Sequence, residues 1–192
     1  LQNDVAALGT FLGKVSSDEY TRALTVYCWV ATHISYDWDS YLILGRNMGW
    51  ESQEAATVLR RKTGVCAGYA KLMVALCKHA NLKCVEVHGF AKGDGFEPGQ
   101  NMEKTNHVWN AIEIYGRWQL IDATWGAHDA NSDIDFYYFC ASPSQLLDTH
   151  FPEDDGWQLL RKPMDSKSFL NRPRIWPSFN KLGFESFLPH SQ

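Results

Sequence analysis

The sequence has no apolar run of the roughly eighteen residues that a membrane-spanning helix needs. It also has no run of five Lys or Arg residues, and 22 acids against 18 bases leave a formal charge of −4. We therefore expect neither a membrane anchor nor a nucleic-acid partner. The first residues lack the basic and apolar regions of a signal peptide, so we expect a soluble, cytoplasmic protein.

The sequence contains few cysteines, and their number is odd. A chain of 192 residues is too large to need disulfides for stability, so we expect free thiols and look for a reactive one among them. The five are widely scattered: Cys28, Cys66, Cys77, Cys84 and Cys140.

Internal repeats and low-complexity tracts are also absent, and 45% hydrophobic residues in 192 are typical of one globular domain. We predict one domain over residues 1–162, followed by a C-terminal extension over 163–192 that resembles the start of a following domain. Because the chain begins at Leu1 without a methionine, and its last residues resemble the entrance to another strand, we expect it to be part of a longer protein.

The hydrophobic pattern predicts helices and strands in separate runs, an α+β arrangement. The Ser-x-x-Glu spacing at residues 16–19 starts a predicted helix over 17–33, and further helices are predicted over 52–61 and 66–80. We predict strands over 83–90, 107–114, 118–125 and 136–140, loops at 34–39 and 45–50, a helical turn at 142–144 and an irregular tail after residue 152.

The most reactive thiol is predicted at Cys66, in the first turn of the helix over 66–80. Unpaired N–H groups and the positive end of the helix dipole favour a thiolate there. Arg60, Arg61 and Lys62 add positive charge just before it. The other four cysteines fall inside predicted helices or strands, where we expect small core residues.

A cysteine nucleophile needs an imidazole to carry the proton and a group that orients the imidazole. If the strands 107–114 and 118–125 are joined by a two-residue turn at Tyr115-Gly116, His107 lies opposite Thr124, and Asp122 is its diagonal neighbour on the same face. A three-residue turn would shift the register by one and, unless a bulge restored it, place the two on opposite faces. With the two-residue turn, three apolar residues share their face: Trp109, Trp118 and Leu120.

Three ordered blocks strongly resemble the transglutaminase-like core of papain-type cysteine enzymes: Gly64–Ala70, Asn106–Asn110 and Gly116–Gly126. Four further blocks are similar, more narrowly, to the kyphoscoliosis peptidase family: Ile34–Asp37, Gly89–Gly93, His150–Asp154 and Trp157–Leu160. The resemblance covers about residues 17–162.

The resemblance implies an α+β fold in which the nucleophile helix packs on an antiparallel sheet. It implies Cys66 as the nucleophile, His107 as the general base and acid, and Asp122 as the orienting carboxylate. The reaction would be attack of a thiolate on a protein amide, giving a thioester acyl-enzyme that is released by water, as in a peptidase, or by a lysine amine, as in a transglutaminase. The backbone N–H of Cys66 is the natural oxyanion donor. No cofactor is implied, and the implied substrate is a protein of the cytoskeleton.

A second class of function stays open beside the enzyme. Some relatives in such a superfamily lose part of the triad, and this chain could be a catalytically silent protein-binding module or scaffold of the cytoskeleton. The filled positions Cys66, His107 and Asp122 favour the enzyme.

Two sets of side chains imitate metal sites. The first has no tight Cys-x₂-Cys pair, which argues against zinc; it comprises Cys77, His79, Cys84 and His88. The second imitates the first ligand positions of a calcium loop; it comprises Asp129, Asn131, Asp133 and Asp135. Ile134 stands where the calcium loop needs Gly, and Cys140 where it needs a bidentate Glu, which favours a solvated acidic loop. We therefore predict no metal site.

Three segments are candidates for the walls of the site. Trp50 is expected in the core, with a tunnel wall as the alternative. Tyr36-Asp37 is expected to cap local structure, again with a wall as the alternative. The loop 91–106 is unusually long, and we favour a lid over a surface excursion because it leads directly into His107.

Overall fold

The computed structural model describes residues 3–39, 52–101, 104–127 and 133–182. The predicted loop at 45–50, Trp50, Asp129 and Asn131 lie outside the described residues. No helix in these ranges is long and apolar enough to span a membrane. In chain order the described elements are α1 (Val5–Gly13), α2 (Glu19–His33), β1 (Ser35–Tyr36), α4 (Ala55–Arg61), β2 (Thr63–Gly64), α5 (Cys66–His79), β3 (Cys84–Ala91), β4 (His107–Ile114), β5 (Arg117–Ile121), α6 (Ala123–Gly126), η2 (Phe136–Tyr138), α7 (Pro143–Leu146), β6 (His150–Pro152), η3 (Asp155–Gln158), α8 (Ser166–Asn171) and α9 (Pro177–Lys181).

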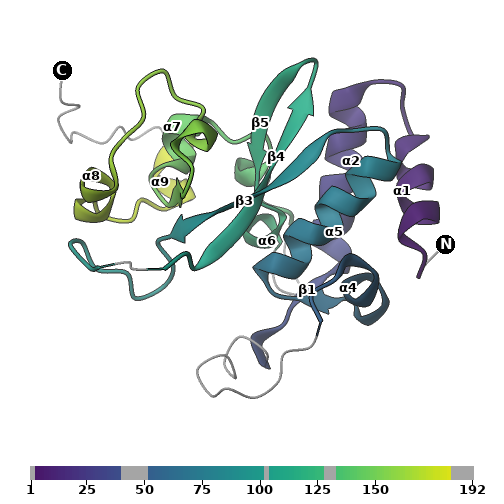
Figure 1. Ribbon diagram of the computed structural model, residues 1–192, viewed down its shortest axis with the longest axis horizontal. Coiled ribbons are helices and arrows are strands. Elements are labelled where there is room, and N and C mark those ends of the chain that lie inside the picture. Colours follow the sequence, from purple (N-terminus) through teal and green to yellow (C-terminus); the bar gives the residue numbers. More distant parts are fainter. Residues whose placement is uncertain (1–2, 40–51, 102–103, 128–132, 183–192) are drawn as a thin grey trace.

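The centre of the molecule is a four-stranded antiparallel sheet with the order β5-β4-β3-β6. Helix α5 packs against β3 and β4, and α1 and α2 pack against α5 in turn (Figure 1). The helices α7, α8 and α9 lie on the opposite side of the sheet in the same view. Helices and an antiparallel sheet in separate layers confirm the predicted α+β class, with the helix of Cys66 packed on the sheet.

Helix α5 forms because apolar residues recur along it at helical spacing and give it one face toward the core. Five of its side chains are almost completely buried: Tyr69, Leu72, Met73, Leu76 and Cys77. A buried amide joins this helix to the sheet, since Asn110 Nδ2 donates to the carbonyl oxygens of Ala70 and Val85, both at 3.1 Å. Both N–H groups of this buried amide therefore have an acceptor, and the two bonds hold α5 at a defined position on β4.

The hairpin of β4 and β5 has the predicted two-residue turn. Tyr115 and Gly116 both have positive φ, +51° and +71°, as a type I′ turn requires. Asn110 pairs with Ile121, so the predicted register is confirmed. The strand predicted over 118–125 is too long, because Asp122 ends it by capping α6: its Oδ1 accepts the N–H groups two and three residues later.

Other differences from the predicted elements are also local. Helix α1 was not predicted; Asp4 caps it by accepting the N–H of Ala7 at 3.0 Å. The segment predicted as a strand over 136–140 is the short 3₁₀ turn η2, because Asp135 caps it through the N–H of Tyr137. The tail after residue 152 contains regular structure, including η3 and α8. Cys140 lies beyond η2 with φ +51°, not in a strand.

The loop between β3 and β4 is closed at its base and attached to the C-terminal segment. Asn106 accepts the N–H of Ala91 at 2.7 Å and donates to its carbonyl oxygen at 3.0 Å. Three contacts join the loop to residues 170–174: the N–H of Gly99 to Leu170 O, Lys92 Nζ to Arg172 O, and the ion pair of Asp94 with Arg174. The lid and the domain boundary at residue 162 stay predictions. If the loop opened as a lid, it would have to break these three contacts or move together with residues 170–174.

Gly89 allows β6 to approach β3 closely. A Cβ at this position would lie 2.2 Å from the carbonyl oxygen of Phe151 and 2.6 Å from the ring of Trp109. We expect Gly89→Ala to lower the free energy of unfolding by about 3 kcal/mol, because backbone and a buried indole must move. Urea denaturation measures this, with Gly93→Ala as the matched control, since a Cβ there meets nothing within 4 Å. Equal loss in both variants would contradict the packing described.

Candidate active site

Cys66 is the first residue of α5. The preceding residue, Val65, is extended, and its N–H is bound by the side chain of Gln53 at 3.0 Å. The chain therefore enters the helix from a fixed direction, and the first N–H groups of the helix lie beside the thiol. Cys66 is only half-buried, so a reagent can reach it.

His107 begins β4, and Asp122 follows the end of β5. The confirmed register brings their side chains together: His107 Nε2 lies 2.7 Å from Asp122 Oδ2. Both side chains are buried. The Asp122 backbone is held as well, because its N–H donates to the carbonyl oxygen of Tyr138 at 2.9 Å. The diagonal contact predicted from the sequence is therefore present.

The orientation of the His107 ring leaves one nitrogen for the thiol. Because Nε2 faces Asp122, Nδ1 is the nitrogen available to Cys66, and this imidazole lowers the pKa of the Cys66 thiol. The backbone of Val108 lowers the pKa of the thiol in the same direction. The structure thus joins His107 to Asp122 by a hydrogen bond, and His107 is near enough to Cys66 to lower the pKa of its thiol; the role of Cys66 as nucleophile stays a prediction.

The electrostatics of the three groups favour an ion pair. Burial alone would lower the pKa of His107, but the charge of Asp122 raises it to about 10. Burial alone would raise the pKa of the Cys66 thiol, but the hydrogen bond and charge of His107 lower it below its ordinary value. Burial opposes ionisation of Asp122 as well, yet His107 holds the pKa of that carboxyl well below its usual range. Imidazolium and carboxylate are therefore the favoured forms of His107 and Asp122, and the Cys66 thiol ionises more readily than a free thiol.

Aromatic rings cover the imidazole–carboxylate pair. Trp109 lies with its ring centroid 6.0 Å from that of His107, and Trp125 at 5.6 Å. The guanidinium of Arg174, from the segment after α8, lies over the ring of Trp125, 5.4 Å from its centroid. Low local polarity strengthens the ion pair beneath these rings.

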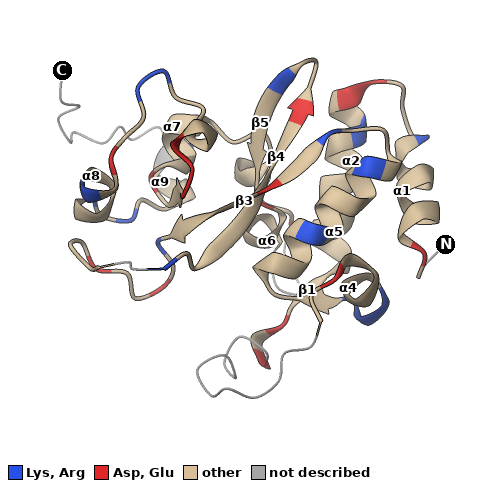
Figure 2. Cartoon of the chain, viewed as in Figure 1, with Lys and Arg blue, Asp and Glu red and all other residues tan. Residues whose placement is uncertain are grey.

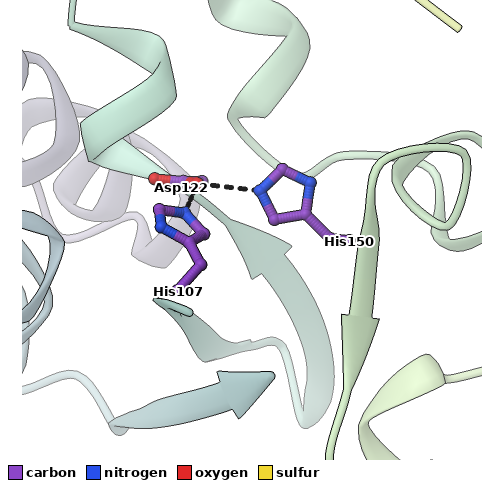
Figure 3. Close-up of side chains that lie close together, drawn as sticks. All are labelled: His107, Asp122 and His150. Carbon is purple, nitrogen blue, oxygen red and sulfur yellow. Dashed lines mark hydrogen bonds and ion pairs between the residues drawn. The ribbon is translucent and has the colours of Figure 1, made fainter. Parts of the chain in front are cut away.

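His150 is a site residue that the sequence reasoning missed. Its Nε2 lies 3.0 Å from the same Oδ2 of Asp122 that His107 contacts, and its side chain is completely buried (Figure 3). His150 comes from β6, which reaches the site by pairing with β3. The one signal for it in the sequence was its position in the block His150–Asp154, which resembles a known family but does not indicate what His150 does.

The other sequence candidates have surroundings of their own. The side chains of Cys77 and Cys84 are in contact with each other, whereas His79 and His88 are exposed. Asp37 pairs with Arg61 at 3.3 Å, and its backbone N–H donates to the carbonyl oxygen of Gly64, two residues before Cys66; a wall of the site stays the alternative for Tyr36-Asp37. Of the calcium-like set, Asp133 is exposed and Asp135 caps η2.

One group of ligand-type side chains gathers within the described ranges. The ligand atoms of His107, Asp122 and His150 lie within 4.8 Å of one another. The nitrogen–oxygen distances of 2.7 and 3.0 Å are those of hydrogen bonds with a proton between the atoms. The arrangement therefore fits a shared carboxylate better than a cation.

Comparisons with known proteins agree with this geometry. The sequence profile described as the transglutaminase-like superfamily matches residues 10–123, which include Cys66, His107 and Asp122. Kyphoscoliosis peptidase of Mus musculus is 32% identical over 178 residues, covering 88% of this chain and 26% of that protein. The protein of the same name from Homo sapiens is 30% identical, with the same coverage of both chains.

The chain thus spans about a quarter of the length of these curated relatives. A solved structure described as the crystal structure of a TGase has a TM-score of 0.50 at 17% identity, covering 70% of this chain and 35% of that chain. This likeness supports the fold.

Proposed function

The chain belongs to the transglutaminase-like superfamily, and we propose that it is a cysteine acyl-transfer enzyme that acts on protein amides through a thioester acyl-enzyme. The observation that carries the proposal is the contact series of Cys66, His107 and Asp122. A half-buried thiol of lowered pKa faces an imidazole that a buried carboxylate keeps protonated. This is the resting state that nucleophilic catalysis by cysteine requires.

Acylation needs one nucleophile, one proton and one oxyanion donor. The Cys66 thiolate attacks the carbonyl carbon of the amide, and the oxyanion that forms is placed to accept the backbone N–H of Cys66 at the start of α5. The C–N bond then breaks, and His107 gives its Nδ1 proton to the leaving amine. The products are a free amine, a thioester on Cys66 and a neutral His107.

Deacylation restores the resting state. Water or a lysine amine gives a proton to His107 as its oxygen or nitrogen attacks the thioester carbonyl. The C–S bond breaks, Cys66 leaves as a thiolate, and the acyl group departs as an acid or a new amide. Asp122 stays ionised throughout and stabilises the imidazolium that is formed.

A polypeptide substrate is part of the proposal. Both relatives are named as peptidases, which supports it. Basic and acidic residues are interspersed over the described elements (Figure 2). The cytoskeletal substrate, the cytoplasmic location and the lack of a nucleic-acid partner remain predictions.

The proposal is tested by the pH dependence of alkylation with iodoacetamide, followed by peptide mapping. We expect Cys66 to react selectively at pH 6, where an unperturbed thiol is only about 0.3% ionised. His107→Ala should reduce this reactivity by about 100-fold, because the imidazolium that stabilises the thiolate is lost. His88→Ala is the matched control, since His88 is exposed and outside the site.

Two results would count against the enzyme. If Cys66 reacts no faster at pH 6 than the other thiols, the thiolate–imidazolium pair does not exist, and a protein-binding module becomes the better description. If His107→Ala leaves the profile unchanged, another group ionises the thiol, and the assigned proton carrier is wrong.

A further inference from the structure

His150 makes the same contact with Asp122 that His107 makes. The two Nε2 atoms lie 3.0 and 2.7 Å from one carboxylate oxygen, Oδ2, and approach it from different strands (Figure 3). The other oxygen accepts the N–H groups of Thr124 and Trp125 at 2.8 and 3.1 Å. The carboxylate therefore has four donors, about as many as it has lone-pair positions.

Only one of the two imidazoles carries a positive charge. Asp122 raises the pKa of His107 to about 10, whereas burial lowers the pKa of His150, and the charge of His107 lowers it further against the opposing effect of Asp122. The ring centroids are 5.3 Å apart in a buried site, where a second positive charge is repelled strongly. His150 is therefore neutral and donates through Nε2–H.

Thr149 holds His150 in this tautomer. Its hydroxyl oxygen lies 2.8 Å from His150 Nδ1. Because Nε2–H is directed at Asp122, Nδ1 of the neutral ring is an acceptor, and the hydroxyl of Thr149 can donate to it in place of the carbonyl oxygen of Leu146, which is 3.3 Å away. Three rings surround the imidazole, with centroids 4.5 to 6.1 Å away: Trp125, Trp109 and Tyr138. The ring is fixed in position as well as in protonation.

We propose that His150 is a positioning residue that aims the Asp122 carboxylate at His107 and weakens its negative potential at the Cys66 thiol. The inference rests on the proposed function. The charge of Asp122 opposes ionisation of Cys66, and a neutral N–H donor directed at the carboxylate reduces that opposition without adding a charge of its own. The site thus keeps one imidazolium, next to the thiol.

Other ionisable groups face the cluster from each element packed against it, and every variant leaves them in place. They are Cys66 from α5, Tyr27 from α2, Tyr138 from η2 and Arg174 from the segment after α8.

The test compares His150→Phe, which keeps a ring but has no donor, with His150→Gln, which keeps an N–H donor. The readout is the acid limb of the pH profile for alkylation of Cys66. We expect its apparent pKa to rise by about one unit in His150→Phe, because one hydrogen bond to a charged group is lost. His150→Gln should return it to within about 0.3 units of the wild type, and His88→Gln should not move it.

A purely structural role makes a different prediction. It would lower the melting temperature of His150→Phe and leave the acid limb where it is in the wild type, and this result overturns the inference. A wild type without low-pH reactivity instead overturns the proposed function, and the inference with it.

Nitrogen-15 spectra of the wild-type histidines keep the test independent of folding in the variants. They should show His150 as a neutral ring protonated on Nε2 between pH 6.5 and about 9. A ring protonated on Nδ1, or one that titrates near its ordinary value, would refute the assigned role.

Discussion

A Cys66→Ala variant is expected to form no acyl-enzyme with 4-nitrophenyl acetate, an activated ester that acetylates thiolates. The wild type should give a burst of 4-nitrophenolate and gain one acetyl group at Cys66, because this thiol has a lowered pKa and is only half-buried. Removing the nucleophile should reduce the burst rate by about 10³-fold or more. Stopped-flow absorbance and intact-protein mass measure the two quantities.

Cys140→Ala is the matched control. Cys140 is also half-buried, but burial raises the pKa of its thiol to about 11, so it is almost entirely protonated at neutral pH. The burst should be unchanged in this variant. A burst that persists in Cys66→Ala but is lost in Cys140→Ala would show that Cys140, and not Cys66, is the nucleophile.

An Asp122→Ala variant is expected to lose about 3 to 5 kcal/mol of unfolding free energy, the usual result of removing one partner from a buried ion pair. The carboxylate accepts four hydrogen bonds, two from imidazoles and two that cap α6. Its loss leaves His107 and His150 without their acceptor in a buried site. Urea denaturation at pH 6.5 measures the change.

The pH dependence of this loss has a defined sign. The pKa of His107 is raised from 6.5 to about 10 in the folded protein, so its contribution is fully present below pH 6.5 and is lost as the pH rises towards 10. The pKa of Asp122 is depressed, so its contribution is present above the unfolded value and is lost as the pH falls below it. The difference in stability between wild type and Asp122→Ala should therefore be largest near pH 5 to 6.5 and shrink on both sides.

Asp165→Ala provides the comparison. Asp165 is an exposed cap of α8 that accepts the N–H of Ser168 at 2.9 Å and touches no histidine in the described structure. Its loss should cost about 1 kcal/mol, with no decline between pH 6.5 and 10. A pH-independent difference for Asp122→Ala would show that capping, and not the imidazolium, dominates its role.

Local patterns predicted the parts of the site that local structure positions. Cys66 was predicted at a helix start because helix formers follow the breaker Gly64, and α5 begins there. The contact of His107 with Asp122 followed from the side-chain alternation of two strands and a turn that needs two residues of positive φ. Both depend on interactions within a few residues of the motif, which a sequence displays directly.

His150 could not be predicted in the same way, because its position depends on pairing between distant segments. Ala91 and His150 are neighbours only through the contact of β3 with β6, which the narrow space at Gly89 permits. The strand predicted over 118–125 is too long for a different, local reason. Alternation continues past Ile121 in the sequence, but a single capping carboxylate ends the strand.

The separations of these residues along the chain also predict the order in which the site assembles during folding. His107 and Asp122 are only 15 residues apart, joined by one tight hairpin, and a hairpin closes on the scale of about 1 to 10 μs. Cys66 joins them only when α5 docks on β4, a contact between distant parts of the chain that forms more slowly. During synthesis or refolding we therefore expect the Cys66 thiol to keep the ordinary reactivity of an unfolded cysteine until His107 and Asp122 have already met.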